Sequence, residues 1–316
     1  MRNRRVVVVG ASGFVGRYVV RRLAAAGAVV TAVARNASGA GFLRPMGDVG
    51  QIALVDCDIG DTARLGSLLE GSDAVVNAVG ILYERGAQKF RALHEDGPAT
   101  LAALASKTGV RRFVHVSALG AAEDAPASYA RSKARGEACA RAAFRAATIL
   151  RPSLIFGPED SFFNRFAAIA RLSPALPLIG GGATRFAPVY VGDVAAAVIA
   201  ALDRDDAPGG IYELAGPREA SLKELFELML AEIGRKRLLL PLPFGLATVA
   251  AFFLEWAPHP LLTRDQVRLL RRDAVPMPGA PGLAALGIEP TALELELPLY
   301  LDRFRPGGRL AGPAAA

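Results

Sequence analysis

The sequence predicts an α/β fold with a doubly wound parallel sheet, followed by a smaller, mostly helical C-terminal domain of the substrate-binding type. Three observations support this. The run Arg5–Val9 is short and β-branched, which is typical of a strand buried on both faces. A glycine-rich turn and a helical pattern follow, and strand-like and helix-like runs then alternate to residue 158. The 316 residues are 52% hydrophobic and 21% charged, enough for one large domain or two unequal ones.

The turn after the first strand has the spacing GxxGxxG. We expect Gly10 to allow the tight turn, Gly13 to let a pyrophosphate approach the backbone, and Gly16 to let the helical stretch 17–27 pack closely on the strand. Free N–H groups at the helix start would bind the phosphates. A tight turn without a ligand is the alternative. Strand, turn and helix in this order favour a Rossmann-type dinucleotide site, which would also include Ser12, Phe14 and Val15.

The end of the second expected strand, 29–34, bears on the choice of nucleotide. A site for NAD would place an acidic residue there to hold the ribose 2′-hydroxyl, but the strand ends in Arg35 and no acid follows before Asp48. A guanidinium pairs with a 2′-phosphate. The sequence therefore favours NADP(H) over NAD(H), with a solvated arginine at a loop start as the alternative.

Two later loops should complete the cofactor site. Asp58 and Ile59 follow the third expected strand, 51–55, and are candidates to contact the adenine. Ala78, Val79 and Gly80 follow the fourth strand, which begins at 74, and should lie over the dinucleotide. We expect helices over 62–69 and 90–108, the second constrained by Gly97-Pro98, and we expect His94 within it to be structural.

Three residues form a candidate catalytic group. The strand 112–117 ends in Ser117, and a helix over 129–143 opens with Tyr129 and Lys133, which share one helix face. The tyrosine hydroxyl would act as a general acid, the ammonium would favour its phenolate, and the serine would orient a substrate carbonyl. Such a Tyr–Lys spacing is common by chance, so its position after the fifth strand gives it weight.

With these motifs, the strings 148–158 and 186–195 make the chain resemble an extended or atypical short-chain dehydrogenase/reductase over residues 5–300. The resemblance implies that 148–158 turns beneath the nicotinamide, where Ser117, Tyr129, Lys133, Pro152, Ser153 and Leu154 would contact the cofactor. It also implies that 186–195 returns the chain to the nucleotide domain, with Asp193 capping a helix. The implied organisation is a nucleotide domain over 1–215, with 151–185 contributing to the small domain, a small domain over 216–302, and a flexible tail over 303–316.

One subfamily resembles this chain more closely. Its strings match at 114–119, 156–166, 188–194, 262–267 and 286–294. They resemble the nucleotide-binding accessory subunit of respiratory complex I (alpha subcomplex subunit 9) and its bacterial relatives. The resemblance implies NADPH held as a structural ligand, partners in the peripheral arm of complex I, and a place at the inner face of the respiratory membrane near the ubiquinone entry.

An active NADP-dependent reductase or epimerase, acting on a carbonyl or sugar-nucleotide substrate, stays open as the alternative. Two departures count against an epimerase. Ser117 and Tyr129 are only 12 residues apart, and His94–Gly97 replaces an asparagine-containing string common in that class. All three candidate catalytic residue types are nevertheless present, so the sequence leaves turnover undecided. A nucleotide-sensing regulator is a third class, for which the sequence offers no positive signal.

The stretch 238–257 is the most apolar part of the C-terminal third. After Pro241 and Pro243 the apolar run 244–257 is too short to span a membrane. We expect either a buried helix of the small domain or a segment that dips into a membrane surface. The buried helix is the first expectation, and the flanking basic residues that support the second are Arg235, Lys236, Arg237, Arg264, Arg268, Arg271 and Arg272. A helix should begin after Ser221, with Glu224 completing its cap.

Composition argues against other classes. The net charge of +7 is spread along the chain without aromatic-interleaved basic motifs, so we expect no nucleic-acid partner. His94, His115 and His259 lack metal-ligand spacing, so we expect no metal. Two cysteines, Cys57 and Cys139, indicate a reducing compartment. The first strand begins at residue 5, which leaves no room for a signal or transit peptide, and we expect a cytoplasmic location.

Overall fold

The computed structural model describes residues 1–308, which form two compact units. The first comprises Met1–Pro152, Val191–Leu214 and Met277–Glu289, and the second comprises Ser153–Tyr190, Ala215–Pro276 and the chain from Pro290 onward. Residues 186–190, expected in the nucleotide domain, lie in the second unit, and residues 277–289, expected in the small domain, lie in the first. The reason for the second difference is local pairing, because the Glu213 N–H donates to the Pro281 carbonyl and the Glu213 carboxylate accepts from the Met277 N–H.

A seven-stranded sheet organises the first unit, and every pairing in it is parallel, which confirms the predicted doubly wound sheet. The strand order is β11-β6-β5-β4-β1-β2-β3. The order reverses between β1 and β4, where folds of this type bind ligands at the carboxyl ends of the strands. The bounds are β1 Arg5–Val9, β2 Val29–Ala34, β3 Ile52–Asp56, β4 Ala74–Asn77, β5 Arg112–Val116, β6 Thr148–Pro152 and β11 Ile211–Leu214.

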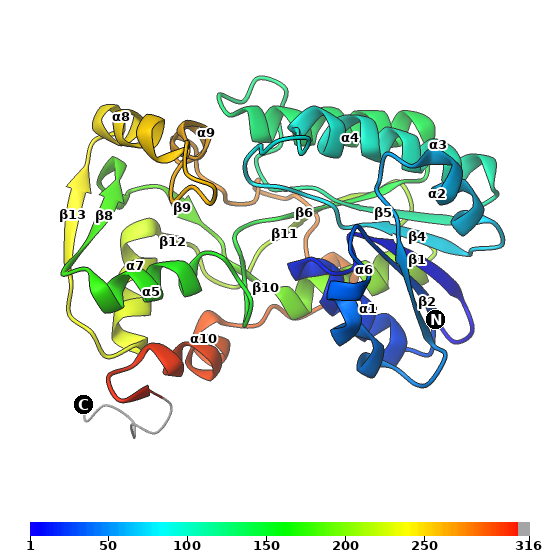
Figure 1. Ribbon diagram of the computed structural model, residues 1–316, viewed down its shortest axis with the longest axis horizontal. Helices are drawn as coiled ribbons and strands as arrows, with labels where there is room; N and C mark the ends of the chain where they lie inside the picture. The colour runs from blue at the N-terminus through cyan, green and yellow to red at the C-terminus, as the bar shows by residue number, and fades with distance from the viewer. Residues whose placement is uncertain (309–316) are drawn as a thin grey trace. The chain divides into compact units, whose positions relative to one another are not determined.

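Helices cover both faces of this sheet (Figure 1). One face carries α2 Thr62–Leu69, α3 Gly97–Lys107 and α4 Ser128–Ala143, and the other carries α1 Phe14–Ala25 and α6 Val191–Asp203. Val7 and Val9 of β1 share one buried cluster with Leu101 of α3 and Ala140 of α4. The alternating side chains of a strand thus seal the sheet against its helices.

Three local expectations in the first unit are corrected. The expected helix 17–27 begins earlier, at Phe14, because Gly13 is its N-cap. The expected single helix 90–108 is a π-helical turn, η2 Arg91–Asp96, running into α3, with a proline in the first turn of α3. Asp193 lies inside the first turn of α6 rather than capping it, because the helix starts at Val191. Two short 3₁₀ segments, η1 Ser38–Met46 and η4 Ala284–Leu286, complete the unit.

The second unit is built from three two-stranded sheets and helices. Its strands are β7 Ile155–Phe156, β8 Ala175–Ile179, β9 Arg185–Phe186, β10 Val189–Tyr190, β12 Ala220–Ser221 and β13 Leu238–Leu242, paired β10-β7, β12-β9 and β13-β8. A core that includes Phe163, Phe226 and Leu297 lies among α5 Phe163–Leu172, α7 Leu222–Glu232 and α10 Leu293–Leu301. The predicted cap of α7 is confirmed, since Ser221 and Glu224 form a capping box. A turn, η3 Gly180–Gly182, follows β8.

The apolar stretch 244–257 forms α8 Phe244–Leu254, and α9 Arg264–Leu269 follows. Only Ala247 and Ala251 of α8 are buried, Phe244 is half-buried, and the other large side chains of the helix are exposed. The expectation of a buried helix is therefore wrong for this segment. Within residues 1–308, none of the helices has the length and hydropathy needed to cross a membrane.

The segment expected to be a flexible tail, 303–316, starts with ordered structure. Asp302–Phe304 forms η5, Phe304 is buried, and the Arg305 Nε donates to the Glu232 carbonyl. Residues 309–316 lie outside the described part of the chain.

Candidate functional site

The glycine turn has the geometry that its spacing predicts. Gly10 has φ +84°, and a Cβ there would lie 2.9 Å from the Ala78 carbonyl carbon. A Cβ on Gly16 would lie 2.1 Å from the Gly10 oxygen, so only glycine lets α1 approach the end of β1 this closely. Gly13 is the N-cap of α1 and has no side chain to cap the first N–H groups. The helix N-terminus is therefore suited to an anion.

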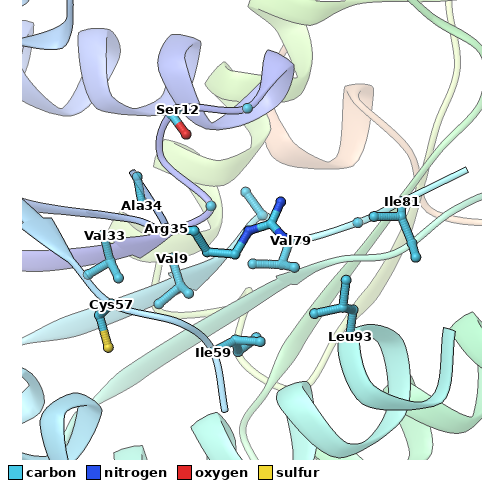
Figure 2. Close-up of a pocket in the computed structure, with 14 residues that line it drawn as sticks. Val9, Ser12, Val33, Ala34, Arg35, Cys57, Ile59, Val79, Ile81 and Leu93 are labelled. Atoms are coloured by element: carbon cyan, nitrogen blue, oxygen red, sulfur yellow. The ribbon is translucent and has the colours of Figure 1, made fainter. Parts of the chain in front are cut away.

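A pocket of about 600 Å³, counting its solvent-open part, lies at the carboxyl ends of β1 to β4 (Figure 2). Eight of the predicted cofactor contacts line it, namely Gly10, Ser12, Gly13, Arg35, Ile59, Ala78, Val79 and Gly80. Six further lining residues were missed, namely Val9, Val33, Ala34, Cys57, Ile81 and Leu93. Val9, Val33 and Ala34 are ends of predicted strands, so the switch-point rule alone could have found them.

Other predicted contacts do not line the pocket. Phe14, Val15 and Gly16 form the first turn of α1 beside it. The Asp58 carboxylate instead accepts the Gly60 N–H, which closes a local turn. In the second unit, the Ser153 hydroxyl donates to the Ala274 carbonyl, next to Leu154, while Pro152 ends β6 in the first unit.

Arg35 follows the last residue of β2 and is exposed at the pocket, where Figure 2 shows its side chain among those of Val9 and Val79. The carboxylate of Asp56, at the end of neighbouring β3, accepts the Ala37 N–H at 2.6 Å. The guanidinium thus lies among pocket residues that are otherwise uncharged, which suits an anionic group on the ligand.

Ser117 does not line the pocket and instead belongs to a buried network of charged side chains. Its hydroxyl donates to Glu137 Oε1 at 2.5 Å, and only 4% of the residue is exposed. The Glu137 carboxylate also accepts from Arg151 Nε and Nη2, at 3.0 and 2.7 Å. Arg151 lies 3.5 Å from the Glu213 carboxylate, and these partners raise the pKa of the guanidinium. The serine hydroxyl proton therefore points to a carboxylate rather than to a substrate carbonyl.

Lys133 lies behind the pocket wall. Its Nζ donates to the Val116 carbonyl at 3.2 Å, and a Cβ on Gly80 would lie 3.3 Å from the same nitrogen. Burial lowers the pKa of this amine to about 8, against the opposing effect of the Glu137 charge. The absence of a side chain at Gly80 leaves only backbone between the amine and the pocket.

Tyr129 is packed against two rings. Its centroid lies 6.0 Å from that of Phe90 and 5.5 Å from that of His94, both edge-on. Burial raises the pKa of the phenol to about 12, so the phenolate is not favoured at neutral pH. The structure places Tyr129 and Lys133 on one helix, as predicted, but without the lowered tyrosine pKa that a proton-transfer role would use.

His94 connects Ile81 in the pocket wall to Ser132 on α4 through two hydrogen bonds. Its Nε2 accepts the Ile81 N–H at 3.0 Å, so Nδ1 carries the proton and donates to the Ser132 hydroxyl at 2.9 Å. Burial lowers the pKa of the ring to about 2, so it is neutral. Gly136 lets this segment pack tightly, since a Cβ there would lie 1.8 Å from the His94 carbonyl oxygen. These contacts agree with the expected structural role.

His115 is the second buried histidine near this site. It is fully buried, its pKa is lowered to about 3 by burial, and neither ring nitrogen has a hydrogen-bond partner among the described residues. Cys57 and Cys139 are free thiols. Among residues 1–308, no group of three or more His, Cys, Asp or Glu side chains is arranged to hold a metal ion.

Comparisons with known proteins agree with this geometry. Residues 6–215 match the model of the NAD dependent epimerase/dehydratase family. The mitochondrial NADH dehydrogenase [ubiquinone] 1 alpha subcomplex subunit 9 of Arabidopsis thaliana is 34% identical over 313 residues, which cover 95% of this chain and 78% of the relative. A ceramide reductase of Caulobacter vibrioides is 34% identical over 195 residues, covering 62% of this chain and 60% of the relative.

A solved structure supports the fold. UDP-glucuronic acid 4-epimerase from Bacillus cereus, in complex with UDP-glucuronic acid and NAD, superimposes with a TM-score of 0.71. The match covers 94% of this chain and 98% of the epimerase at 18% identity, which is a likeness of fold alone.

Proposed function

The chain belongs to the NAD dependent epimerase/dehydratase family, and we propose that it is an accessory subunit of respiratory NADH:ubiquinone oxidoreductase (complex I) that holds NADP(H) as a structural ligand. Its proposed partners are peripheral-arm subunits of that complex, at the inner face of the respiratory membrane. The 34% identity to the Arabidopsis subunit over 95% of this chain supports the assignment.

The residues present fit a dinucleotide. Gly13 and the start of α1 would hold the phosphates, Arg35 would pair with a 2′-phosphate, and the apolar walls formed by Ile59 and Val79 would hold the rings. When bound, a nicotinamide would supply hydride chemistry. A ligand that binds only the folded chain stabilises it by about 4 kcal/mol at a thousandfold excess over Kd. That linkage is sufficient reason for an accessory subunit to retain the nucleotide.

The observation that carries a structural role, rather than turnover, is the state of the three candidate catalytic groups. The Ser117 hydroxyl is bonded to Glu137, the Lys133 amine is bonded to a backbone carbonyl, and the pKa of Tyr129 is about 12. A general acid works best when its pKa lies near the working pH. This arrangement supports holding a nucleotide more than moving a proton.

An NADP-dependent reductase is the second candidate. It is favoured by the Lys133 amine directly behind Gly80 in the pocket wall, and by the similarity to a ceramide reductase. In this function Tyr129 would donate the proton and Lys133 would hold the nucleotide ribose.

The deciding experiment purifies the tagged chain in mild detergent from its native membranes and identifies partners and released nucleotide by mass spectrometry. We expect complex I subunits and stoichiometric NADPH. A chain that elutes alone would contradict the accessory role. The Arg35→Asp variant should exchange NADPH for NADH or lose nucleotide, and unchanged NADPH content would contradict the assigned preference.

The Tyr129→Phe variant separates the two candidates. An accessory subunit should keep its nucleotide and support complex I activity unchanged. A reductase should keep its nucleotide but lose turnover of carbonyl substrates, with wild-type chain assayed in parallel.

A further inference from the structure

We propose that α8 inserts its exposed side into the headgroup region of an anionic lipid bilayer and anchors the second unit there. Large side chains cover the outside of this helix and the turn after it, and we call Leu246, Val249, Phe252, Phe253, Leu254 and Trp256 the α8 face. Phe253 is 69% exposed and Trp256 is 79% exposed, whereas Ala247 and Ala251 are fully buried. The helix thus has small residues inside and large ones outside, the reverse of a core helix.

The exposed apolar surface is concentrated here. In the described chain, nine of the 17 large hydrophobic side chains that are exposed fall within residues 238–261. Besides the α8 face they are Leu238, Leu240 and Leu261. Scattered exposed hydrophobic residues are normal, but such a concentration marks an interaction site.

The α8 helix is held firmly by its unit. Ala247 and Ala251 form one buried cluster with Ile179 of β8 and Val267 of α9. The Glu255 carboxylate pairs with Arg264 at 2.5 Å, and the same guanidinium lies 5.2 Å from the centre of the Phe252 ring. The α8 face is therefore presented by a fixed helix and not by a loose loop.

Positive charge flanks this face on the side of α9. Residues 235–272 contain seven lysine and arginine residues but only two acidic ones, Glu255 and Asp265. Exposed arginines occur on α9, which packs against α8, and directly after it, at positions 264, 268, 271 and 272. An apolar surface flanked by arginines matches an anionic bilayer, because the cations meet the phosphates while the rings and aliphatic groups enter below them. Trp256, at the end of the helix, is a residue type enriched at that boundary.

The length of α8 fits insertion along the surface. Eleven residues rise about 16 Å, roughly half of a hydrocarbon core of about 30 Å. Pro243 is the N-cap of the helix and Pro258 lies four residues after its end, so the two prolines limit its length. The proposal extends the proposed location at the respiratory membrane by naming the surface that is contacted.

The test uses the purified full-length chain and unilamellar vesicles, either phosphatidylcholine alone or phosphatidylcholine with 30 mol% phosphatidylglycerol (about the anionic fraction that gives a strongly negative surface). Trp256 is the single tryptophan of the chain, so its fluorescence reports the α8 face directly. We expect a blue shift and co-flotation with the anionic vesicles, at least tenfold weaker binding to neutral ones, and loss of binding at high salt.

Two matched variants complete the test. Val249→Glu combined with Phe253→Glu should lower vesicle binding at least tenfold. Leu172→Glu, on α5 of the same unit and 91% exposed, should leave it unchanged. Thermal unfolding by circular dichroism checks that both variants fold. Equal losses in the two variants, or no blue shift with any vesicle, would overturn the proposal.

Other occupants give different outcomes. A dimer in light scattering that the Val249/Phe253 variant abolishes, without vesicle binding, would assign the α8 face to a second copy and overturn the proposal. Loss of complex I association in the same variant, again without vesicle binding, would assign it to a protein partner. Because vesicles contain no complex I, vesicle binding without complex I subunits would leave this inference standing while the proposed function fails.

Discussion

Two apolar helices of similar length, α6 and α8, meet opposite environments. Helix α6 buries its large side chains, Val194, Val198 and Leu202 among them, and packs against α1, β5 and β6. Helix α8 buries two alanines and exposes Leu246, Leu254 and the adjacent Phe252 and Phe253. Mean hydropathy therefore does not decide burial in this chain. What decides it is which residues, small or large, lie on the side that meets the rest of the unit.

The largest expected effect comes from placing a charge in each helix, which tests whether α6 is buried and the outer side of α8 is exposed. Val198→Asp should cost about 5 kcal/mol or more, because an unpaired carboxylate would be buried against the sheet. Val249→Asp should change stability by less than about 0.5 kcal/mol, because that position is exposed. Urea unfolding followed by circular dichroism measures both. Similar losses in the two variants would show that α8 is buried in solution.

A second pair of variants, one in the core of the second unit and one on the α8 face, tests whether that unit as a whole is loosely packed. Phe226, in the core of that unit, is fully buried, and Phe226→Ala should cost about 4 kcal/mol. Phe253→Ala should cost less than about 0.5 kcal/mol. The urea denaturation midpoints of the two variants measure both costs. A small loss of stability for Phe226→Ala would show that the core of the second unit is loosely packed.

Lowering the pH should destabilise the first unit, because His94 and His115 are buried there as neutral rings. Both have folded-state pKa values near 2 to 3 against about 6.5 when unfolded, so the stability they contribute is present above pH 6.5 and is lost as the pH falls below it. At pH 5 the loss is about 2 kcal/mol for each ring.

Urea midpoints between pH 7.5 and 5 measure this loss. His115→Phe, which replaces an unpartnered buried ring, should remove about half of this loss, with His94 retaining the other half. His259→Gln, at an exposed position beyond α8, is the matched control and should leave it unchanged. A profile that His115→Phe does not alter would contradict the assignment.

The smallest expected effect is that of Gly13→Ala, in the exposed glycine turn at the pocket, on the affinity for NADPH. A Cβ on Gly13 would lie 3.2 Å from the Gly10 oxygen, a tight but tolerable contact, whereas on Gly16 it would lie 2.1 Å from that oxygen. Gly13→Ala should therefore keep the fold and lower NADPH affinity about tenfold, or about 1.4 kcal/mol. Gly16→Ala should lose both. Calorimetry with NADPH distinguishes them, and unchanged affinity in Gly13→Ala would argue against phosphate binding at this turn.

The sequence predicted the first unit well because its signals are local. The β-branched runs place β1 and β2 at the observed residues, and the glycine spacing determines a turn that only glycine can form. For α8 the sequence left a buried helix and a membrane-surface segment open, because composition does not reveal which side of a helix meets its neighbours.

The candidate catalytic group shows the same limit. Tyr129, Lys133 and Glu137 recur every four residues, so a shared helix face was predictable. That Glu137 would take the Ser117 hydroxyl depends on Arg151, from another strand, and on how α4 packs over β5 and β6. Cys57 and Leu93 reach the pocket from separate loops and helices for the same reason.

The interleaving of the two units has a consequence for how the polypeptide is made. The chain passes from one unit to the other after residues 152, 190, 214, 276 and 289. A ribosome that has added 276 residues has completed neither unit, so neither unit can form its full set of contacts until the chain beyond residue 276 has been made. A premature stop codon before position 289 would damage both halves at once. The segment that follows residue 276 decides whether either half becomes a finished domain.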